Sequence, residues 1–209
     1  MRHSGAVAGS VTLSPEVTVT GRPTREDAWR LLTEHTSSPN LIKHALAVEA
    51  VMRAYARRFD EDEEAWGIVG LVHDFDYEQN PTEDTHLHAA RRILAERGWP
   101  EAWIRAVCSH ADYMGIPRDT LMARALFAVD ELTGFLTACA LVRPDRSIAN
   151  VKVKSVKKKL KDKAFARGVS REDVRRGAEE LGVELDEHIA FVRDAMAGIA
   201  AELGLPPRE

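Results

Sequence analysis

Hydrophobic residues recur with the period of an α-helix along most of the chain after residue 23. The stretch 40–59 is the clearest example, because its charged residues avoid one apolar stripe that consists of Leu41, Ala45, Val48, Met52 and Tyr55. The same period predicts further helices within six segments, namely residues 24–35, 82–97, 100–112, 119–142, 170–182 and 185–204. The pattern therefore indicates an all-α protein.

One apolar run, residues 65–75, has no clear period and fits either a buried strand or a buried helix. We assign it to a helix because its neighbours are helical. Helix starts have their own signals. Thr24 and Asp27 have the spacing of a capped start, and Asp119 is expected to cap the long helix that ends before Pro144.

The length and composition fit one domain with an appendage, because 209 residues with 44% hydrophobic content can bury a sizeable core. We expect a flexible leader at residues 1–23, within which a short strand at 11–19 stays open. The helical core is predicted at residues 24–143. Residues 144–209 are predicted to form a basic segment and C-terminal helices that pack on the same domain.

Compartment and partners are constrained by what the sequence lacks. It has no secretory signal and no run of about 18 apolar residues, so we expect a cytoplasmic protein without a membrane partner. Its two cysteines, Cys108 and Cys139, lie in apolar helical patterns, which indicates buried thiols in a reducing compartment. The net charge of −4 disfavours an extended nucleic-acid surface.

Several histidines and acids fall on the apolar faces of the predicted helices. His44 lies between Val48 and Val51, and Asp130 lies among apolar residues, where an unpaired carboxylate is costly. His86 and His110 also face inward, whereas His88 falls on the polar side. Taken singly, each inward histidine fits a core residue bonded to a carbonyl, and Asp130 fits a salt bridge or helix-capping contact.

Taken together, the inward polar residues favour a shared metal site. Four imidazoles and two carboxylates would occupy one helical core, and a metal would satisfy all of them: His44, His73, Asp74, His86, His110 and Asp130. Nitrogen and oxygen ligands without thiolates suit Mn²⁺, Fe²⁺, Mg²⁺, Ni²⁺ or Zn²⁺. The sequence leaves the choice among these ions open.

The order His44, His73-Asp74, Asp130 on successive helices resembles the H…HD…D pattern of the HD-domain superfamily of metal-dependent phosphohydrolases. The match to a group of small HD-domain proteins extends over most of the chain from residue 24. It includes the segments "NLIKHALAVEAVMRAYA", "GLVHDFDYE", "AVDELTGFLTACALVRP" and "VKVKSVKKKLKDKAFARGV". The resemblance implies an HD-domain helical bundle, and hydrolysis of a phosphate ester, with a nucleotide among the candidates, by metal-activated water.

The resemblance also suggests roles. His44, His73, Asp74 and Asp130 would form the primary metal site, and the catalytic Asp74 would bridge to a second ion held by His86 and His110. In the single-ion alternative, these two histidines bind substrate phosphate or water. Asp76 is the second candidate catalytic residue, because it could orient a ligating histidine or act as a general base, and Glu78 is a weaker candidate for the same roles.

A run of seven lysines lies between residues 152 and 163. It could line the site with positive charge for substrate phosphates, bind RNA, or form a solvated helix face. For phosphate binding we choose Lys152, Lys154 and Lys157. The expected partner is a small phosphorylated substrate. The alternative is a regulatory or nucleic-acid-binding HD protein with a structural metal, and the oligomeric state stays open.

Overall fold

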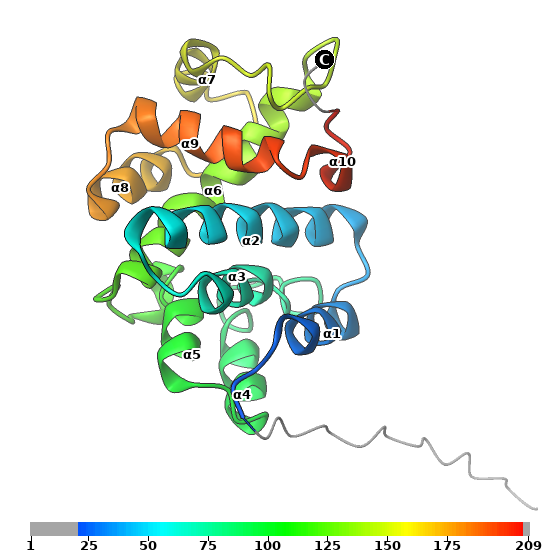
Figure 1. Ribbon diagram of the computed structural model, residues 1–209, viewed down its shortest axis with the longest axis vertical. Coiled ribbons are helices and arrows are strands. Elements are labelled where there is room, and N and C mark those ends of the chain that lie inside the picture. Colours follow the sequence, from blue (N-terminus) through cyan, green and yellow to red (C-terminus); the bar gives the residue numbers. More distant parts are fainter. Residues whose placement is uncertain (1–20, 207–209) are drawn as a thin grey trace, which may run out of the picture.

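The computed structural model describes residues 21–206, which contain ten α-helices, one short 3₁₀-helix (η1, Asp112–Met114) and no strand (Figure 1). The α-helices are α1 Arg25–His35, α2 Pro39–Phe59, α3 Glu63–Val72, α4 His88–Glu96, α5 Glu101–Cys108, α6 Leu121–Leu141, α7 Val153–Leu160, α8 Arg171–Leu181, α9 Leu185–Ala197 and α10 Ala200–Leu203. The all-α prediction is confirmed. Residues 1–20 of the predicted leader lie outside the described residues.

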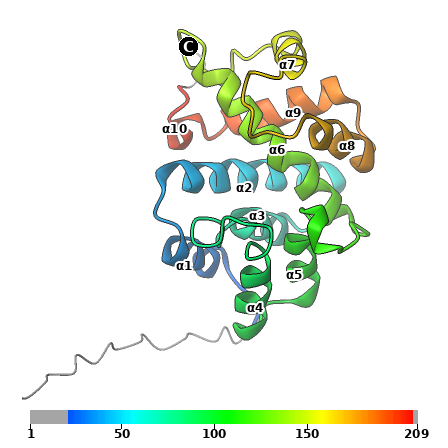
Figure 2. The ribbon, with the colours of Figure 1, turned by 180° about the vertical axis from the view of Figure 1, so that it is seen from behind.

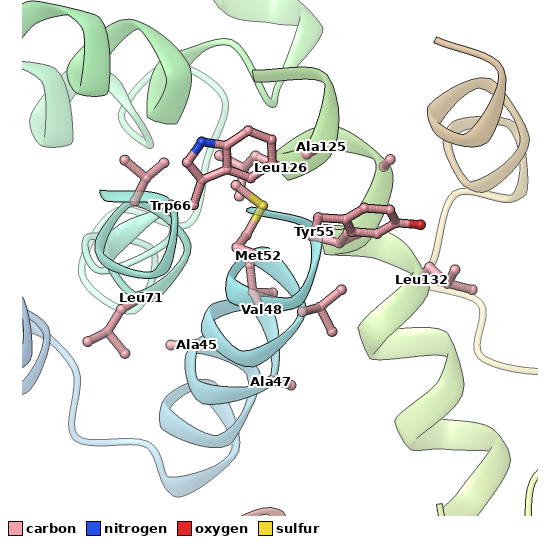
Figure 3. Close-up of a cluster of buried hydrophobic side chains, with 14 of the residues drawn as sticks. Ala45, Ala47, Val48, Met52, Tyr55, Trp66, Leu71, Ala125, Leu126 and Leu132 are labelled. Carbon is pink, nitrogen blue, oxygen red and sulfur yellow. The ribbon is translucent and has the colours of Figure 1, made fainter. Parts of the chain in front are cut away.

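Helix α2 lies at the centre of the molecule, between α1 and α3 on one side and α6 and α9 on the other (Figures 1 and 2). Apart from Leu41, its apolar stripe is buried, and Val48 and Met52 pack with Trp66 of α3 and Leu126 of α6 (Figure 3). Truncation of such a side chain typically costs about 2–5 kcal/mol. Because it contacts both layers, α2 sets their separation and thereby the positions of the polar groups that α2, α3 and α6 carry.

The apolar run at 65–75 is helical up to Val72, as expected, and the Asp62 carboxylate caps its start by accepting a hydrogen bond from the Ala65 N–H. Thr24 and Asp27 form the predicted capping box. The cap of α6 is Thr120 instead of Asp119, because the Thr120 hydroxyl accepts the Ala123 N–H.

The helix predicted at residues 82–97 begins only at His88, and the residues before it form turns. The N-cap residue Leu87 has a positive φ of 62°, and its side chain makes no capping bond. The Asp76 carboxylate, which precedes Leu87 by 11 residues, does so instead, because its Oδ2 accepts the Leu87 N–H at 3.0 Å and the Ala90 N–H at 3.3 Å. A buried tertiary contact therefore satisfies N–H groups that a local side chain usually caps.

The C-terminal helices pack on both central helices: α8 crosses α6, and α9 contacts α2 and α6. The contact of α8 is close at Gly177, where an added Cβ would lie 2.6 Å from the Ala128 Cα. Only glycine allows the two backbones to approach this far. The segment predicted as one helix at 185–204 is divided at Gly198 and Ile199 into α9 and α10. No helix within residues 21–206 is both long and apolar enough to cross a membrane.

His188 links α9 to both central helices. It is fully buried, its Nε2–H donates to the Ala128 carbonyl at 2.9 Å, and its Nδ1 accepts from the Tyr55 hydroxyl at 2.6 Å. These partners require the neutral imidazole. Burial lowers the pKa of His188 to about 4, although the Ala128 carbonyl opposes this shift.

We predict that His188 makes the fold sensitive to acid. Its pKa is about 4 when folded and about 6.5 when unfolded, so the unfolded state binds more protons between these values. The contribution of the neutral side chain is complete above about pH 6.5 and decreases as the pH falls towards 4, by about 2 kcal/mol between pH 7.5 and pH 5. Urea unfolding in the presence of EDTA measures it.

The matched variant is His188→Gln, whose amide can donate to the same carbonyl but does not titrate. The wild type should lose about 2 kcal/mol more stability than this variant over the same interval. Equal losses in the two proteins would show that His188 is not the acid-sensitive group.

Candidate metal centre

Six polar side chains from five parts of the fold meet beside α2. One comes from α2, two follow the last turn of α3, one precedes α4, one follows α5 and one lies in the middle of α6; in that order they are His44, His73 with Asp74, His86, His110 and Asp130. The six residues proposed from the sequence are thus brought together. His88 is exposed, and His35 is hydrogen-bonded to Gln79 outside the cluster.

The first group within the cluster contains His44, His73, Asp74 and Asp130, each of which offers one ligand atom within 4.8 Å of the others. His44 Nε2 lies 3.0 Å from Asp130 Oδ1 and 3.2 Å from His73 Nε2. The two helices that carry these histidines approach closely because Gly70 has no side chain; a Cβ there would lie 3.1 Å from the Val48 carbonyl oxygen.

The second group contains Asp74, His86 and His110. Asp74 Oδ1 lies 3.2 Å from His86 Nε2 and 3.3 Å from His110 Nε2, while its Oδ2 lies 3.5 Å from His73 Nε2. One carboxylate therefore presents an oxygen to each group. This is the geometry expected of a residue that bridges two cations.

Hydrogen bonds at Nδ1 fix the tautomers of three histidines. The Nδ1–H of His73 donates to the Gly70 carbonyl at 2.8 Å, that of His110 to the Val107 carbonyl at 2.7 Å, and that of His86 to Asp76 Oδ1 at 2.9 Å. In the neutral rings each Nε2 then carries a lone pair directed into the cluster. Hydrogen-bond acceptors consequently face acceptors, and Asp74 Oδ1 is buried without a hydrogen-bond donor.

The electrostatics of the cluster favour positive charge between these acceptors. Burial is the largest effect on His73 and opposes charging, but the carboxylates of Asp74 and Asp130 outweigh it and raise the pKa of His73 well above its usual value. Burial likewise opposes the ionisation of the two acids, yet the neighbouring histidines outweigh it and lower the pKa of both Asp74 and Asp130. Divalent cations would supply this positive charge, and nitrogen and oxygen ligands suit such ions.

Asp76 acts on the cluster through His86. It is fully buried, both of its oxygens accept hydrogen bonds, and it does not line the cavity described below. Of its two expected roles, the geometry supports orientation of a ligand histidine and does not support direct contact with water or substrate. The contacts of Asp76 therefore favour a positioning role, in which it acts through His86.

Glu78 has a different function from either expected role. Its carboxylate accepts the backbone N–H groups of Ser37 at 2.7 Å and Ser38 at 2.9 Å, immediately before α2. These bonds lower the pKa of Glu78. Glu78 thus anchors the start of the central helix and contributes no group to the cluster.

The three lysines chosen as phosphate ligands lie elsewhere. Lys154 and Lys157 line a separate cavity that shares no residue with that of the cluster, and Lys157 pairs with Asp186 at 2.8 Å. Helix α6 separates these lysines from the cluster, because the part of α6 after Asp130 extends roughly 16 Å beyond that residue before the basic segment begins. The prediction that Lys152, Lys154 and Lys157 bind phosphate at this centre is corrected; α7 lies beyond α9 (Figure 2).

The cluster opens into a cavity of about 580 Å³, a volume typical of small-molecule sites. Sequence reasoning missed several side chains that line it, among them Glu83, Asp112, Tyr113, Asp173 and Arg176. The first three lie near His86 or His110 in the sequence and could have been found by that proximity. Asp173 and Arg176 belong to α8, and no local signal connects them to the site.

The family model described as HD domain matches residues 41–134, the segment from α2 to α6 that contains all six residues of the cluster. This segment is an HD domain, and proteins of the HD-domain superfamily are generally metal-dependent hydrolases. Comparisons with curated proteins and with solved structures give no significant match.

We predict that the two histidines of the "HLH" segment differ completely in metal binding. His86→Ala removes a nitrogen that faces Asp74, so metal content should fall by about one ion per chain if both groups are filled. His88→Ala, the matched control, removes an exposed ring and should retain the wild-type content. Metal analysis after gel filtration decides between these results, and a loss confined to His88→Ala would contradict the geometry.

Asp76→Asn should weaken the ion held by His86 without removing a direct ligand. Loss of such a supporting carboxylate typically costs about 10–100-fold in metal affinity. Competition with a fluorescent chelator measures the affinities of the two positions separately. Affinity at the His44 group should be retained, and equal weakening at both positions would indicate a general loss of folding instead.

Proposed function

We propose that the protein is a divalent-metal-dependent phosphohydrolase that cleaves a phosphate ester by attack of water. The observation that carries the proposal is the partly buried Asp74 carboxylate, which faces the lone pairs of three histidines and whose buried Oδ1 has no hydrogen-bond donor within residues 21–206. The HD domain supports the same reaction class.

Two metal positions are proposed. His44, His73, Asp74 and Asp130 would hold one ion, and Asp74, His86 and His110 would hold a second. Divalent ions at these positions would lower the pKa of water and neutralise charge on the phosphoryl oxygens. A single ion at the first position, with His86 and His110 contacting phosphate or water, is the alternative.

The protein itself contributes orientation. The carbonyls of Gly70 and Val107 and the carboxylate of Asp76 hold three imidazoles in fixed tautomers, so little reorganisation is needed when substrate arrives. Asp74 and Asp130 line the cavity, and their proposed role is to orient the attacking water. The cavity volume suits a small phosphorylated substrate.

A second candidate is a regulatory or nucleic-acid-binding HD protein in which the metal is structural. It is favoured by the basic surface of α7, where Lys154, Lys158 and Lys161 have no ion-pair partner within residues 21–206. RNA retention by a metal-loaded protein that hydrolyses no phosphoester would support this candidate over the enzyme.

The proposed hydrolase is tested by metal analysis and a phosphoester panel with Mn²⁺ or Mg²⁺, including p-nitrophenyl phosphate. Asp74→Ala should lose metal and reduce kcat/KM by at least about a thousand-fold, because both proposed positions lose a ligand. Asp84→Ala removes an exposed acid of the neighbouring turn and should behave as wild type. Turnover that persists after verified metal removal, or in Asp74→Ala, would refute the proposal.

A further inference from the structure

The cavity beyond the proposed metal positions is lined mainly by acids and aromatic rings. The acids come from the turn before α4, from η1, from α6 and from α8; they are Glu83, Asp112, Glu131 and Asp173. The rings come from the turns after α3, from η1 and from α6; they are Tyr77, Tyr113 and Phe127. Tyr77 is 40% exposed and Tyr113 is 38% exposed, so both rings are available to a ligand. Carboxylates and aromatic faces both attract cations.

Arg176 is the only lysine or arginine among the described residues that line this cavity, and its charge is already neutralised. Its Nη2 lies 2.5 Å from Asp112 Oδ2 and 2.9 Å from Asp173 Oδ1. Asp112 also pairs with Arg118 at 2.8 Å, and Arg118 in turn binds Glu180. These bonds hold α8 against the turn that follows His110, and they leave no free cation for a second anionic group of a substrate.

Glu83 adds a negative charge that no group within residues 21–206 neutralises. It is exposed, lines the cavity, and has no ion-pair or hydrogen-bond partner within residues 21–206. Burial raises the pKa of the Tyr113 hydroxyl, and the negative charges of Asp74, Asp76 and Glu83 add to this increase. A phosphate at the metal centre would therefore have a negatively charged wall beyond it.

We propose that the substrate is a small phosphomonoester whose organic group carries a positive charge, such as an ammonium. This proposal rests on the proposed hydrolase function and names its substrate class. Phosphate would bind at the metal centre, and the ammonium would lie against Glu83 and the aromatic rings. Water forms a new P–O bond, the P–O bond to the organic group breaks, and the departing alkoxide takes up a proton to give an amino alcohol and inorganic phosphate.

The same wall disfavours substrates with further negative charge. Sites for di- and triphosphates place arginine, lysine or backbone N–H groups against each phosphate. Here the second phosphate would face carboxylates and a guanidinium whose charge is paired with Asp112 and Asp173 through its Nη2. Nucleoside triphosphates should consequently be poor substrates.

Two nearly isosteric compounds of opposite charge test the proposal directly. O-phosphoethanolamine carries an ammonium where phosphoglycolate carries a carboxylate. The reference is p-nitrophenyl phosphate, whose organic group is uncharged. With the Mn²⁺-loaded protein, kcat/KM for O-phosphoethanolamine should exceed that for phosphoglycolate by about ten-fold or more, because like charges would meet in the second case.

Reversing the charge of Glu83 tests whether this residue causes the preference for a positively charged substrate. Glu83→Lys should reduce the preference at least about five-fold, whereas Glu202→Lys makes the same change of net charge at an exposed position of α10 and should leave it unchanged. Hydrolysis of p-nitrophenyl phosphate with an equal or reversed preference would refute the substrate class while the hydrolase function stands. A metal-loaded protein that cleaves none of the three would refute both. A preference that survives Glu83→Lys intact would refute the assignment of the wall.

Discussion

The partly buried carboxylate of Asp74 faces three histidines whose neutral rings direct lone pairs towards it, and much of the fold serves to maintain this contact. His73, His86 and His110 each use Nδ1 for a hydrogen bond elsewhere, so their Nε2 lone pairs and the Asp74 oxygens form a concentrated negative site. Such an arrangement is unfavourable unless a cation is present. The packing of α2 against α3 and α6 therefore stabilises a site whose own groups repel one another.

The helical period was sufficient for residues that lie well inside long helices. His44 and Asp130 were placed correctly because α2 and α6 each run through many turns, so that errors at their ends do not rotate the middle. The metal cluster as a whole could be proposed for a more general reason: six polar groups facing one helical core need a common partner.

His86 and His110 were expected to face inward on helices, but both lie in turns beside α4 and α5. Their orientation comes from Asp76 and from the Val107 carbonyl, contacts that helical periodicity does not encode. The cavity residues of α8, Asp173 and Arg176, were missed because the sequence of a solvated helix does not indicate which cavity the helix will border. The lysine run was wrongly assigned to the site, because the charge of a segment does not show how far α6 separates it from the cluster.

The two bonds that Asp76 makes to the start of α4 connect folding with metal binding. One oxygen of this carboxylate accepts hydrogen bonds from the backbone N–H groups of Leu87 and Ala90, and the other accepts one from His86 Nδ1–H. Fraying of the first turn of α4 would therefore release His86 from its fixed orientation. By reciprocity, an ion bound to His86 would slow the hydrogen exchange of those two amides, so the helix terminus would report the occupancy of the neighbouring metal position.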